Sequence, residues 1–272
     1  RLIHCSERAV QLMGWEHHAS VEGRLLLELL NATDARLNQA LQRLQSGQES
    51  QNREENAFVR RDGTEIHAEW FNSALTDATG RVTSIMTLVQ DVSARVQMAR
   101  QQYHRANHDA LTGLDNRASF HERLERSLAR ARPAADLLAL LFIDLDGFKR
   151  INDQQGHQAG DEVLRIVAQR LLRTVREGDT VARLGGDEFL VMLDKDVTPL
   201  EPERIGQRII EALSQPMIVD GQNLEIGASI GVAMHPPLPG QLEVLMNHAD
   251  QAMYAAKRAG KGRLFHAESE GA

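Results

Sequence analysis

The chain has 272 residues, of which 42% are hydrophobic and 25% charged, a composition typical of a globular protein of about two domains. Its 31 basic and 38 acidic residues give a formal net charge of -7, which argues against a DNA- or RNA-binding surface and leaves room only for a local basic pocket. The single cysteine, Cys5, excludes an internal disulfide, so we expect a reducing, cytoplasmic location. No apolar run approaches the roughly 20 residues that cross a bilayer. The start at Arg1 indicates a piece of a longer protein, for which membrane anchoring stays open.

The first 93 residues predict helices followed by a small antiparallel sheet. Residues 25–30 and 34–44 have the apolar spacing of helices. Turn signals at Asp62-Gly63 and at residues 77–80 separate three segments of strand character. The predicted strands are 57–61, 65–68 continuing into 70–75, and 82–89. We therefore expect a three-stranded meander with helices on one face.

Residues 91–108 contain no Gly or Pro and predict a helix. Apolar side chains recur along it at alternating spacings of four and three, at Val92, Val96, Ala99, Tyr103, Ala106 and Ala110. Two interpretations stay open: an amphipathic connector packed on its own domain, or a stalk that pairs with a second copy in a parallel dimer. The second is favoured because the helix joins two domains without a flexible break.

Beyond residue 108, predicted helices and strands alternate. The expected helices are 119–130, 160–176, 203–213 and 242–259, and the expected strands are 137–143, 180–184, 189–193 and 224–234. The continuously apolar segment 137–143 predicts a strand buried on both faces. Gly260 is expected to end the last helix.

Two acidic clusters follow or interrupt predicted strands. Asp144 and Asp146 come directly after the apolar segment and, because side chains alternate along a strand, point the same way. Asp187 and Glu188 follow the tight turn Gly185-Gly186. If the two strands are neighbours, Asp144 and Asp187 converge on a site suited to Mg²⁺, which takes one or two carboxylates together with substrate phosphates. The alternative is that these acids are ordinary polar turn residues.

Two further sets of polar residues have a functional and a structural interpretation. Asn152 and Asp161 could read a base edge, since a carboxylate accepts the donor pair that guanine presents; alternatively, Asp161 caps a helix. Lys257 and Lys261 lie four apart at the end of the last predicted helix, on one face. They could bind phosphate, or they could complement the helix dipole at a solvated surface.

Taken together, these motifs resemble the GGDEF family of diguanylate cyclases. The signature is residues 185–189, Gly-Gly-Asp-Glu-Phe, and the other matching blocks are 108–117, 144–149, 152–153, 156–161, 249–257 and 260–261. The resemblance covers roughly residues 100–266. It implies a Mg²⁺-dependent reaction, with Mn²⁺ as the alternative ion, that joins two GTP molecules into cyclic di-GMP in a homodimer and releases two pyrophosphates.

The resemblance also assigns roles to residues at matching positions. The metal is expected on Asp144, the backbone carbonyl of Leu145, and Asp187. Asp187 is also the expected base for the 3′-hydroxyl, and Glu188 supports the site. The residues expected to bind GTP are Asn152 and Asp161 at the guanine, with His157 nearby, and Lys149, Lys257 and Lys261 at the triphosphate, where Lys149 stabilises the transition state.

Arg176 and Asp179 end five residues before the double glycine and resemble the family's inhibitory RxxD site, which binds the product. As a bare pattern RxxD is weak, and the alternative is a surface salt bridge.

The first half resembles a PAS sensor domain, through residues 62–64, Trp70 and residues 89–93, with its opening strand missing or shortened. The implied organisation is a truncated PAS domain at 1–93, a connecting helix at 94–107 and a GGDEF domain at 108–272. The expected fold class is α+β: an antiparallel PAS sheet with helices, then a palm-like sheet flanked by helices. No motif identifies a PAS ligand. The rival function is a regulatory module that binds GTP or cyclic di-GMP and controls a further domain.

Overall fold

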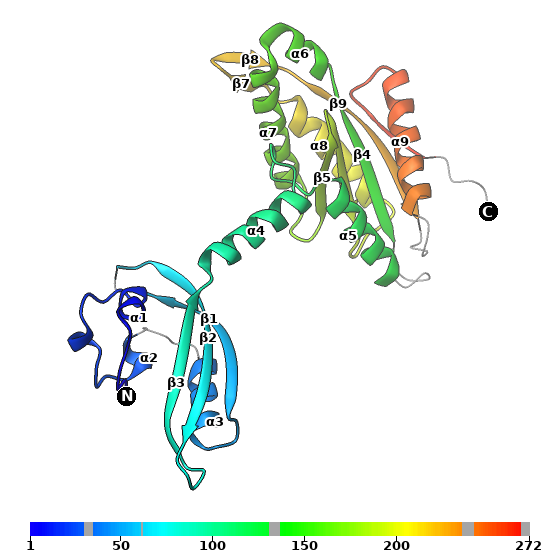
Figure 1. Ribbon diagram of the computed structural model, residues 1–272. Helices are drawn as coiled ribbons and strands as arrows, with labels where there is room; N and C mark the ends of the chain where they lie inside the picture. The colour runs from blue at the N-terminus through cyan, green and yellow to red at the C-terminus, as the bar shows by residue number, and fades with distance from the viewer. Residues whose placement is uncertain (30–34, 61, 131–136, 236–241, 268–272) are drawn as a thin grey trace. The chain divides into compact units, whose positions relative to one another are not determined.

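A computed structural model describes residues 1–29, 35–60, 62–130, 137–235 and 242–267. The chain forms two compact units, Arg1–Gln102 and Tyr103–Ala272. Both are α+β, as the sequence predicts. Helix α4 (Ser93–Asn107) contains the boundary between the units (Figure 1). None of the described helices is both long and apolar enough to cross a bilayer.

The first unit contains the predicted meander. Its strands are β1 (Gln51–Val59), β2 (Glu65–Thr76) and β3 (Val82–Asp91), antiparallel and in the order β1-β2-β3. Gly63 and Gly80 have φ values of 84° and 82°, a left-handed backbone that glycine adopts without steric cost. Both turns fall where the sequence signals place them.

One face of this sheet carries the core of the first unit. Phe58, Ile66 and Trp70 are buried against helical residues that include Val10 and Leu37. The short helices of the unit are α1 (Glu7–Leu12), a 3₁₀ turn (His18–Ser20), α2 (Leu26–Leu29) and α3 (Ala35–Gln45). The predicted helices 25–30 and 34–44 correspond to α2 and α3, and their residues 30–34 lie outside the described part of the chain.

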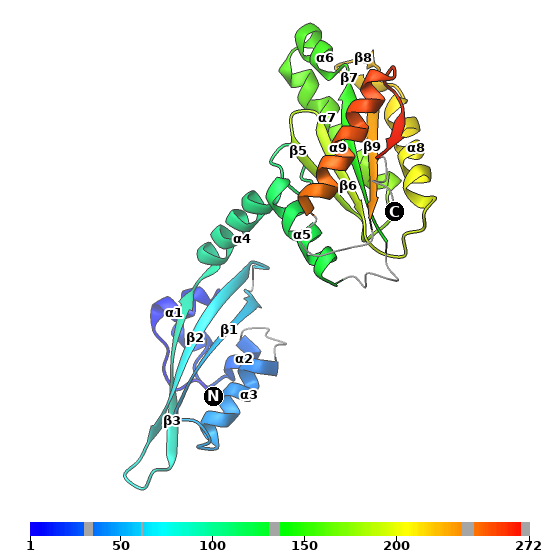
Figure 2. The same ribbon diagram turned by 90° about the vertical axis from the view of Figure 1, so that its right-hand side faces the viewer.

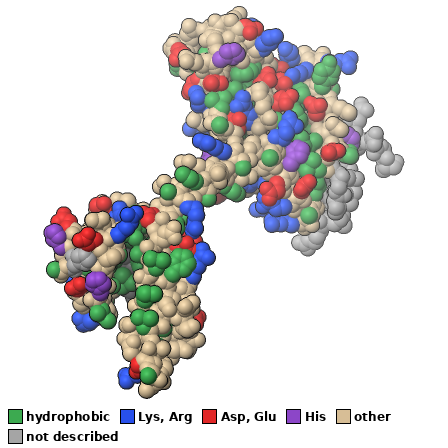
Figure 3. All heavy atoms as spheres, in the orientation of Figure 1, with side chains coloured by type: hydrophobic (Ala, Val, Ile, Leu, Met, Phe, Trp, Pro, Cys, Tyr) green, Lys and Arg blue, Asp and Glu red, His purple; other side chains and the backbone are tan. Residues whose placement is uncertain are grey.

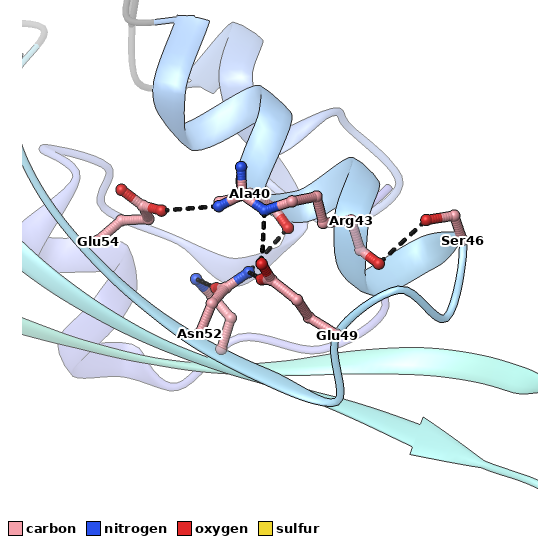
Figure 4. Close-up of polar contacts among 7 residues, drawn as sticks. Ala40, Arg43, Ser46, Glu49, Asn52 and Glu54 are labelled. Atoms are coloured by element: carbon pink, nitrogen blue, oxygen red, sulfur yellow. Dashed lines mark hydrogen bonds and ion pairs between the residues drawn. The ribbon is translucent and has the colours of Figure 1, made fainter.

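Polar contacts fasten α3 to the start of β1 (Figure 4). The Asn52 side-chain amide donates to the Ala40 carbonyl at 2.9 Å and to Glu49 at 3.0 Å. Arg43 pairs with Glu49 at 2.8 Å and with Glu54 at 3.2 Å. Because these contacts join neighbouring segments, they hold the helix against the edge of the sheet.

Helix α4 lies at the predicted position, and all of its residues are described. None of them is buried, and Met98 and Tyr103 are 64% and 69% exposed. Val92, the first residue of the predicted seam, lies just before the helix and is 3% exposed, so both interpretations of the seam stay open. The dimer stalk stays a prediction.

The second unit is built on a five-stranded sheet in the order β10-β9-β4-β6-β5. Its strands are β4 (Leu138–Asp146), β5 (Thr180–Gly185), β6 (Glu188–Leu193), β9 (Gly227–His235) and β10 (Leu264–His266). Its helices are α5 (Arg117–Arg130), α6 (Phe148–Gln155), α7 (His157–Thr174), α8 (Glu201–Ser214) and α9 (Leu242–Arg258). Strand β4 is central and buried at eight of its nine positions, as predicted for a strand covered on both faces.

The two faces of β4 belong to separate cores. Leu141 and Ile143 pack in a cluster with residues of α7 and α8. Leu140 and Phe142 pack in a second cluster with residues of α5 and α9. Figures 1 and 2 show these helix pairs on opposite sides of the sheet. Asp144 and Asp146 continue the alternation of Phe142, so both side chains leave the strand on the α9 side, as the sequence predicts.

Several elements differ from the sequence expectations. Helix α7 begins at His157 rather than at residue 160. Gly156, with φ 85°, is the only residue between α6 and α7, and it caps the end of the first helix and the start of the second. Helix α6, the hairpin of β7 (Met217–Val219) and β8 (Gln222–Leu224), and β10 were not predicted. All four are short, and short segments carry too few turns of periodicity to be detected.

Candidate functional site

The two acidic clusters meet at the end of β4. Strands β4 and β6 pair antiparallel, with Asp144 opposite Glu188. The Leu145 amide donates a hydrogen bond to the Asp187 carbonyl at 3.2 Å. The β5–β6 turn carries this residue back to the strand end because Gly185 and Gly186 adopt φ values of 144° and 53°. The convergence expected from the sequence is thus present in the structure.

Asp144 is a buried carboxylate with a cation against it. It is only 7% exposed, and the Lys257 ammonium lies 2.6 Å from its Oδ2. Burial raises the pKa of Asp144; the hydrogen bond from Lys257 opposes this shift, and the negative charge of Asp187 adds to it. The strand end therefore concentrates negative charge that one lysine only partly balances.

Helix α9 can place Lys257 there because it packs very closely on β9. A Cβ built on Gly231 would lie 2.0 Å from the Ala249 carbonyl oxygen and 2.2 Å from the Met253 nitrogen. Lys257 follows Met253 by one helical turn, so the missing side chain at Gly231 brings the lysine within reach of Asp144.

Lys261, by contrast, is not on the same helical face as Lys257, and that sequence prediction is wrong. Helix α9 ends at Arg258, and Lys261 lies in the following loop with a φ of 64°. Gly260 (φ 116°) turns the chain out of the helix, as a C-terminal glycine does. Lys261 is exposed.

The guanine-binding candidates lie on α6 and α7. Gly160 is the contact point between the two helices, since a Cβ there would lie 1.9 Å from Asn152 Oδ1. Asp161 is exposed on the next residue of α7, and His157 is exposed at its start. Asp161 is not a helix cap, because the N-cap of α7 is Gly156, so the structural alternative for this residue is wrong. Close packing at Gly160 fixes where the Asn152 amide lies.

The remaining predicted site residues lie near the strand ends. Lys149 is exposed in the first turn of α6, two residues after Gly147, which starts the helix with a φ of 86°. Glu188 is half-buried as the first residue of β6.

Arg183 is a site residue that the motif reading left without a role. Its guanidinium donates to the Gly186 carbonyl at 3.1 and 2.8 Å and to the Asp109 carboxylate at 3.0 Å. Burial would raise the pKa of Asp109, but hydrogen bonds from Thr112 and Arg183 outweigh it and hold that pKa below its usual value. Arg183 therefore clamps the glycine turn from which Asp187 projects. The sequence signal that could have identified this contact is an arginine two residues before the double glycine, together with the acid Asp109 in the block 108–117.

Arg176 and Asp179 form an ion pair at 3.3 Å, and the Asp179 side chain is only 1% exposed. Burial raises the pKa of Asp179 against the opposing effect of Arg176. Arg176 also pairs with Glu201 at 3.3 Å. A pocket of about 360 Å³ adjoins this pair, and its lining includes Arg176, Arg204 and Arg208. The pair thus combines a buried acid with an adjoining cavity, and the inhibitory site stays a prediction.

The donor set at the strand end fits a hard divalent cation. The described residues contain no group of three His, Cys, Asp or Glu side chains able to hold a metal. Mg²⁺ needs fewer: it takes one or two carboxylates and fills its other positions with water and phosphate. Two carboxylates, Asp144 and Asp187, lie together here beside the backbone of Leu145.

Figure 3 shows basic and acidic side chains interspersed on the displayed face, so positive charge is local to sites rather than spread over that face.

Comparisons with known proteins agree with this geometry. The family described as diguanylate cyclase, GGDEF domain, matches residues 106–263, and the PAS fold matches residues 1–92. Diguanylate cyclase TpbB of Pseudomonas aeruginosa is 45% identical over 61% of this chain and 38% of its own length. The probable diguanylate cyclase DgcE of Escherichia coli is 35% identical over 94% of this chain and 23% of its own.

Among solved structures, the coiled coil and GGDEF domain of DgcB from Caulobacter crescentus, in complex with c-di-GMP, has a TM-score of 0.60 at 30% identity. That match covers 65% of this chain and 93% of the DgcB chain. The present chain spans well under half the length of both curated relatives. With the GGDEF match covering most of the second unit, the chain belongs to the diguanylate cyclase family defined by the GGDEF domain, and it carries a PAS domain ahead of it.

Proposed function

We propose that the second unit condenses two GTP molecules into cyclic di-GMP and two pyrophosphates, with Mg²⁺ and in a homodimer. The observation that carries the proposal is the meeting of Asp144 and Asp187 across the β4–β6 pair, with Lys257 against Asp144. Acids that were only polar turn residues would have no reason to crowd one buried strand end, where the charge of Asp187 raises the pKa of Asp144.

The residues around that end divide the work. Asp144, Asp187 and the carbonyl of Leu145 would hold the metal, which supplies charge neutralisation for phosphoryl transfer. Asn152 and Asp161, with His157 nearby, would bind the guanine edge. Lys149, Lys257 and Lys261 would bind the triphosphate, Lys149 also stabilising the transition state. Asp187 would accept the proton of the attacking 3′-hydroxyl, and Glu188 would support it.

The reaction needs two units. Each holds one GTP, and the 3′-oxygen of one nucleotide attacks the α-phosphorus of the other. The phosphorus–oxygen bond to pyrophosphate breaks, and the hydroxyl proton leaves to Asp187. The same transfer in the opposite direction closes the ring. Helix α4, which buries none of its residues, is the element we propose to pair with its counterpart in a second copy.

The deciding experiment is incubation of the chain with GTP and Mg²⁺ over a range of protein concentrations, followed by nucleotide separation. We expect cyclic di-GMP and pyrophosphate, formed at a rate that rises more steeply than the first power of protein concentration, because two half-sites must meet. GTP that binds without forming product would contradict the proposal and favour the regulatory module. Replacing Mg²⁺ by Mn²⁺ tests the alternative ion.

Arg176 and Asp179 would form an inhibitory site for the product, supported by the pocket beside the pair and its further arginines. Arg176→Ala is expected to abolish inhibition by added cyclic di-GMP while the initial rate stays unchanged. Arg165→Ala is the matched control, because Arg165 forms a similar ion pair with Glu162 three residues away, at 2.8 Å, on the exposed face of α7. Unchanged inhibition in Arg176→Ala would remove this assignment.

A further inference from the structure

Asp146 shares the strand end with Asp144 but has different partners. The hydroxyl of Ser229 donates to Asp146 at 2.9 Å from Oδ1 and 3.0 Å from Oδ2. The backbone amide of Gly262 also donates to Oδ2, at 3.0 Å. We propose that Asp146 is a positioning residue that holds the loop carrying Lys261 in place for the triphosphate.

The carboxylate of Asp146 is held from two sides. Ser229, on β9, is fully buried, so its hydroxyl has little freedom to turn elsewhere. Gly227 lies opposite Asp146 in the β4–β9 register, and a Cβ there would approach Oδ2 to 3.3 Å. Both oxygens of Asp146 thus already accept hydrogen bonds from the protein, whereas Asp144 pairs with the Lys257 ammonium. By this difference in partners, Asp146 is a structural acid, whereas Asp144, two residues earlier on β4, is the proposed metal ligand.

The loop needs such a holder because its backbone is unusual. Gly260, Lys261 and Gly262 have φ values of 116°, 64° and 59°. Two of these are glycines, but Lys261 is one of three non-glycine residues with positive φ among those described. A side chain with a Cβ disfavours this conformation, which persists only where surrounding contacts enforce it. The Gly262 amide bonded to Asp146 is the next peptide group along the chain.

The consequence rests on the proposed role of Lys261 at the triphosphate. Asp146 ties the loop to the strand that presents Asp144, so the lysine and the metal ligands share one rigid frame. The Lys261 amide also donates to the Ala256 carbonyl at 3.2 Å, and the Arg263 guanidinium donates to the Lys261 carbonyl at 3.1 Å, but neither contact reaches β4. Without Asp146 the loop loses its hydrogen bond to β4, and the Lys261 ammonium moves away from the phosphates. A misplacement of about 1 Å is enough to weaken such a contact strongly.

A double-mutant cycle in the full chain tests this inference. The variants are Asp146→Ala, Lys261→Ala and the pair, and the measurement is calorimetric binding of a non-hydrolysable GTP analogue with Mg²⁺. We expect each single variant to bind roughly tenfold more weakly, and the pair to bind no more weakly than Lys261→Ala, because both act through one contact. Asp146→Asn should restore most of the affinity, since its carbonyl can accept from Gly262 while its amide donates to Ser229. Glu203→Ala, which removes an exposed carboxylate of the same unit, is the charge-matched control.

Hydrogen exchange without nucleotide separates this inference from the proposed function. In Asp146→Ala the amide of Gly262 should lose protection, and Ser229→Ala should give a smaller loss. Unchanged protection, or penalties in the cycle that multiply, would overturn the positioning role even in an active enzyme. If Lys261→Ala binds the analogue as well as the unaltered chain does, the triphosphate role of the loop is wrong, and the inference falls with it. A wild-type chain that binds no analogue would count against the proposed function itself.

Discussion

The two units bury carboxylates in different ways. In the first unit, Glu69 on β2 is 3% exposed and pairs with the guanidinium groups of Arg53 and Arg95. In the second, Asp144 is 7% exposed and pairs with the flexible ammonium of Lys257, with other acids close by. Two planar guanidinium groups lock a carboxylate into the structure, whereas a single ammonium beside competing negative charge is a replaceable counterion. This difference is what the proposed metal site in the second unit requires.

The sheets of the two units also differ, in how many of their faces are covered. The first unit covers one face of its sheet and exposes Phe71, Met86 and Leu88 on the other. The second unit covers both faces, so polar residues of the central strand can reach solvent only at its ends. Asp144 and Asp146, to which we assign the proposed roles, lie at one such end because the rest of the strand is buried on both faces.

The largest effect that would sharpen this comparison is expected from Asp187→Ala. Loss of the carboxylate that we propose as both metal ligand and base should lower cyclic di-GMP formation by on the order of 10³-fold. Product formation from GTP and Mg²⁺ is the measurement, with Glu203→Ala as the control. Activity within a few-fold of the unaltered chain would show that the strand end is not where the chemistry occurs.

Trp70→Ala tests whether the first and the second unit unfold independently. Trp70 is 2% exposed and its indole donates to Asn56 at 2.7 Å, so truncation should destabilise the first unit by about 3–5 kcal/mol. Scanning calorimetry should show the transition of that unit lowered and the transition of the second unit retained. Phe71→Ala, on the neighbouring residue of the opposite face, is the control and should cost far less. A common shift of both transitions would break the division into two units.

Lys257→Met tests the replaceable counterion. Without a cation, ionised Asp144 is left buried beside other acids, and the second unit should lose about 1–3 kcal/mol of stability in metal-free buffer. This loss of stability should grow as the pH rises above the ordinary pKa of aspartate. The pKa of Asp144 is raised in the folded protein, so Asp144 keeps its proton at low pH, and only its ionised form needs a cation.

Mg²⁺ provides the discriminating condition for that variant. Saturating Mg²⁺ should recover most of the lost stability, because the metal takes over the charge of Lys257. Arg258→Met, which alters the exposed neighbouring cation of α9, is the control, and urea unfolding with and without Mg²⁺ is the measurement. A penalty that Mg²⁺ leaves unchanged would mean that Lys257 is as structural as Arg53.

The smallest expected effect is that of Gly160→Ala. The added methyl group collides with Asn152 Oδ1, so the KM for GTP should rise roughly tenfold, about 1.4 kcal/mol, with little loss of stability. The same substitution combined with Asn152→Ala should add little, because the displaced amide is already gone. A Gly160→Ala variant with unchanged KM would show that the contact between α6 and α7 does not set the guanine site.

Short-range patterns predicted much of the fold. The meander follows from turn dipeptides between alternating segments, and β4 from an apolar run without polar interruption. These signals come from a few consecutive residues, which is the range over which propensity and periodicity act. Elements with little periodicity, such as α6 and β10, escaped for the same reason.

What the sequence alone determined was therefore the identity of the chemical groups and the local turn that carries each: Asp144 at a strand end, Asp187 after two glycines, Lys257 near a helix end. Only the tertiary structure decided how they combine, through the strand order β10-β9-β4-β6-β5, in which β4 pairs with the later strands β6 and β9 rather than with its chain neighbour β5. That order brings Lys257 onto Asp144 and brings Ser229 and Gly262 onto Asp146. The physical reason is that each of these contacts joins residues more than 80 positions apart, and packing of the whole sheet, not local preference, brings such residues together.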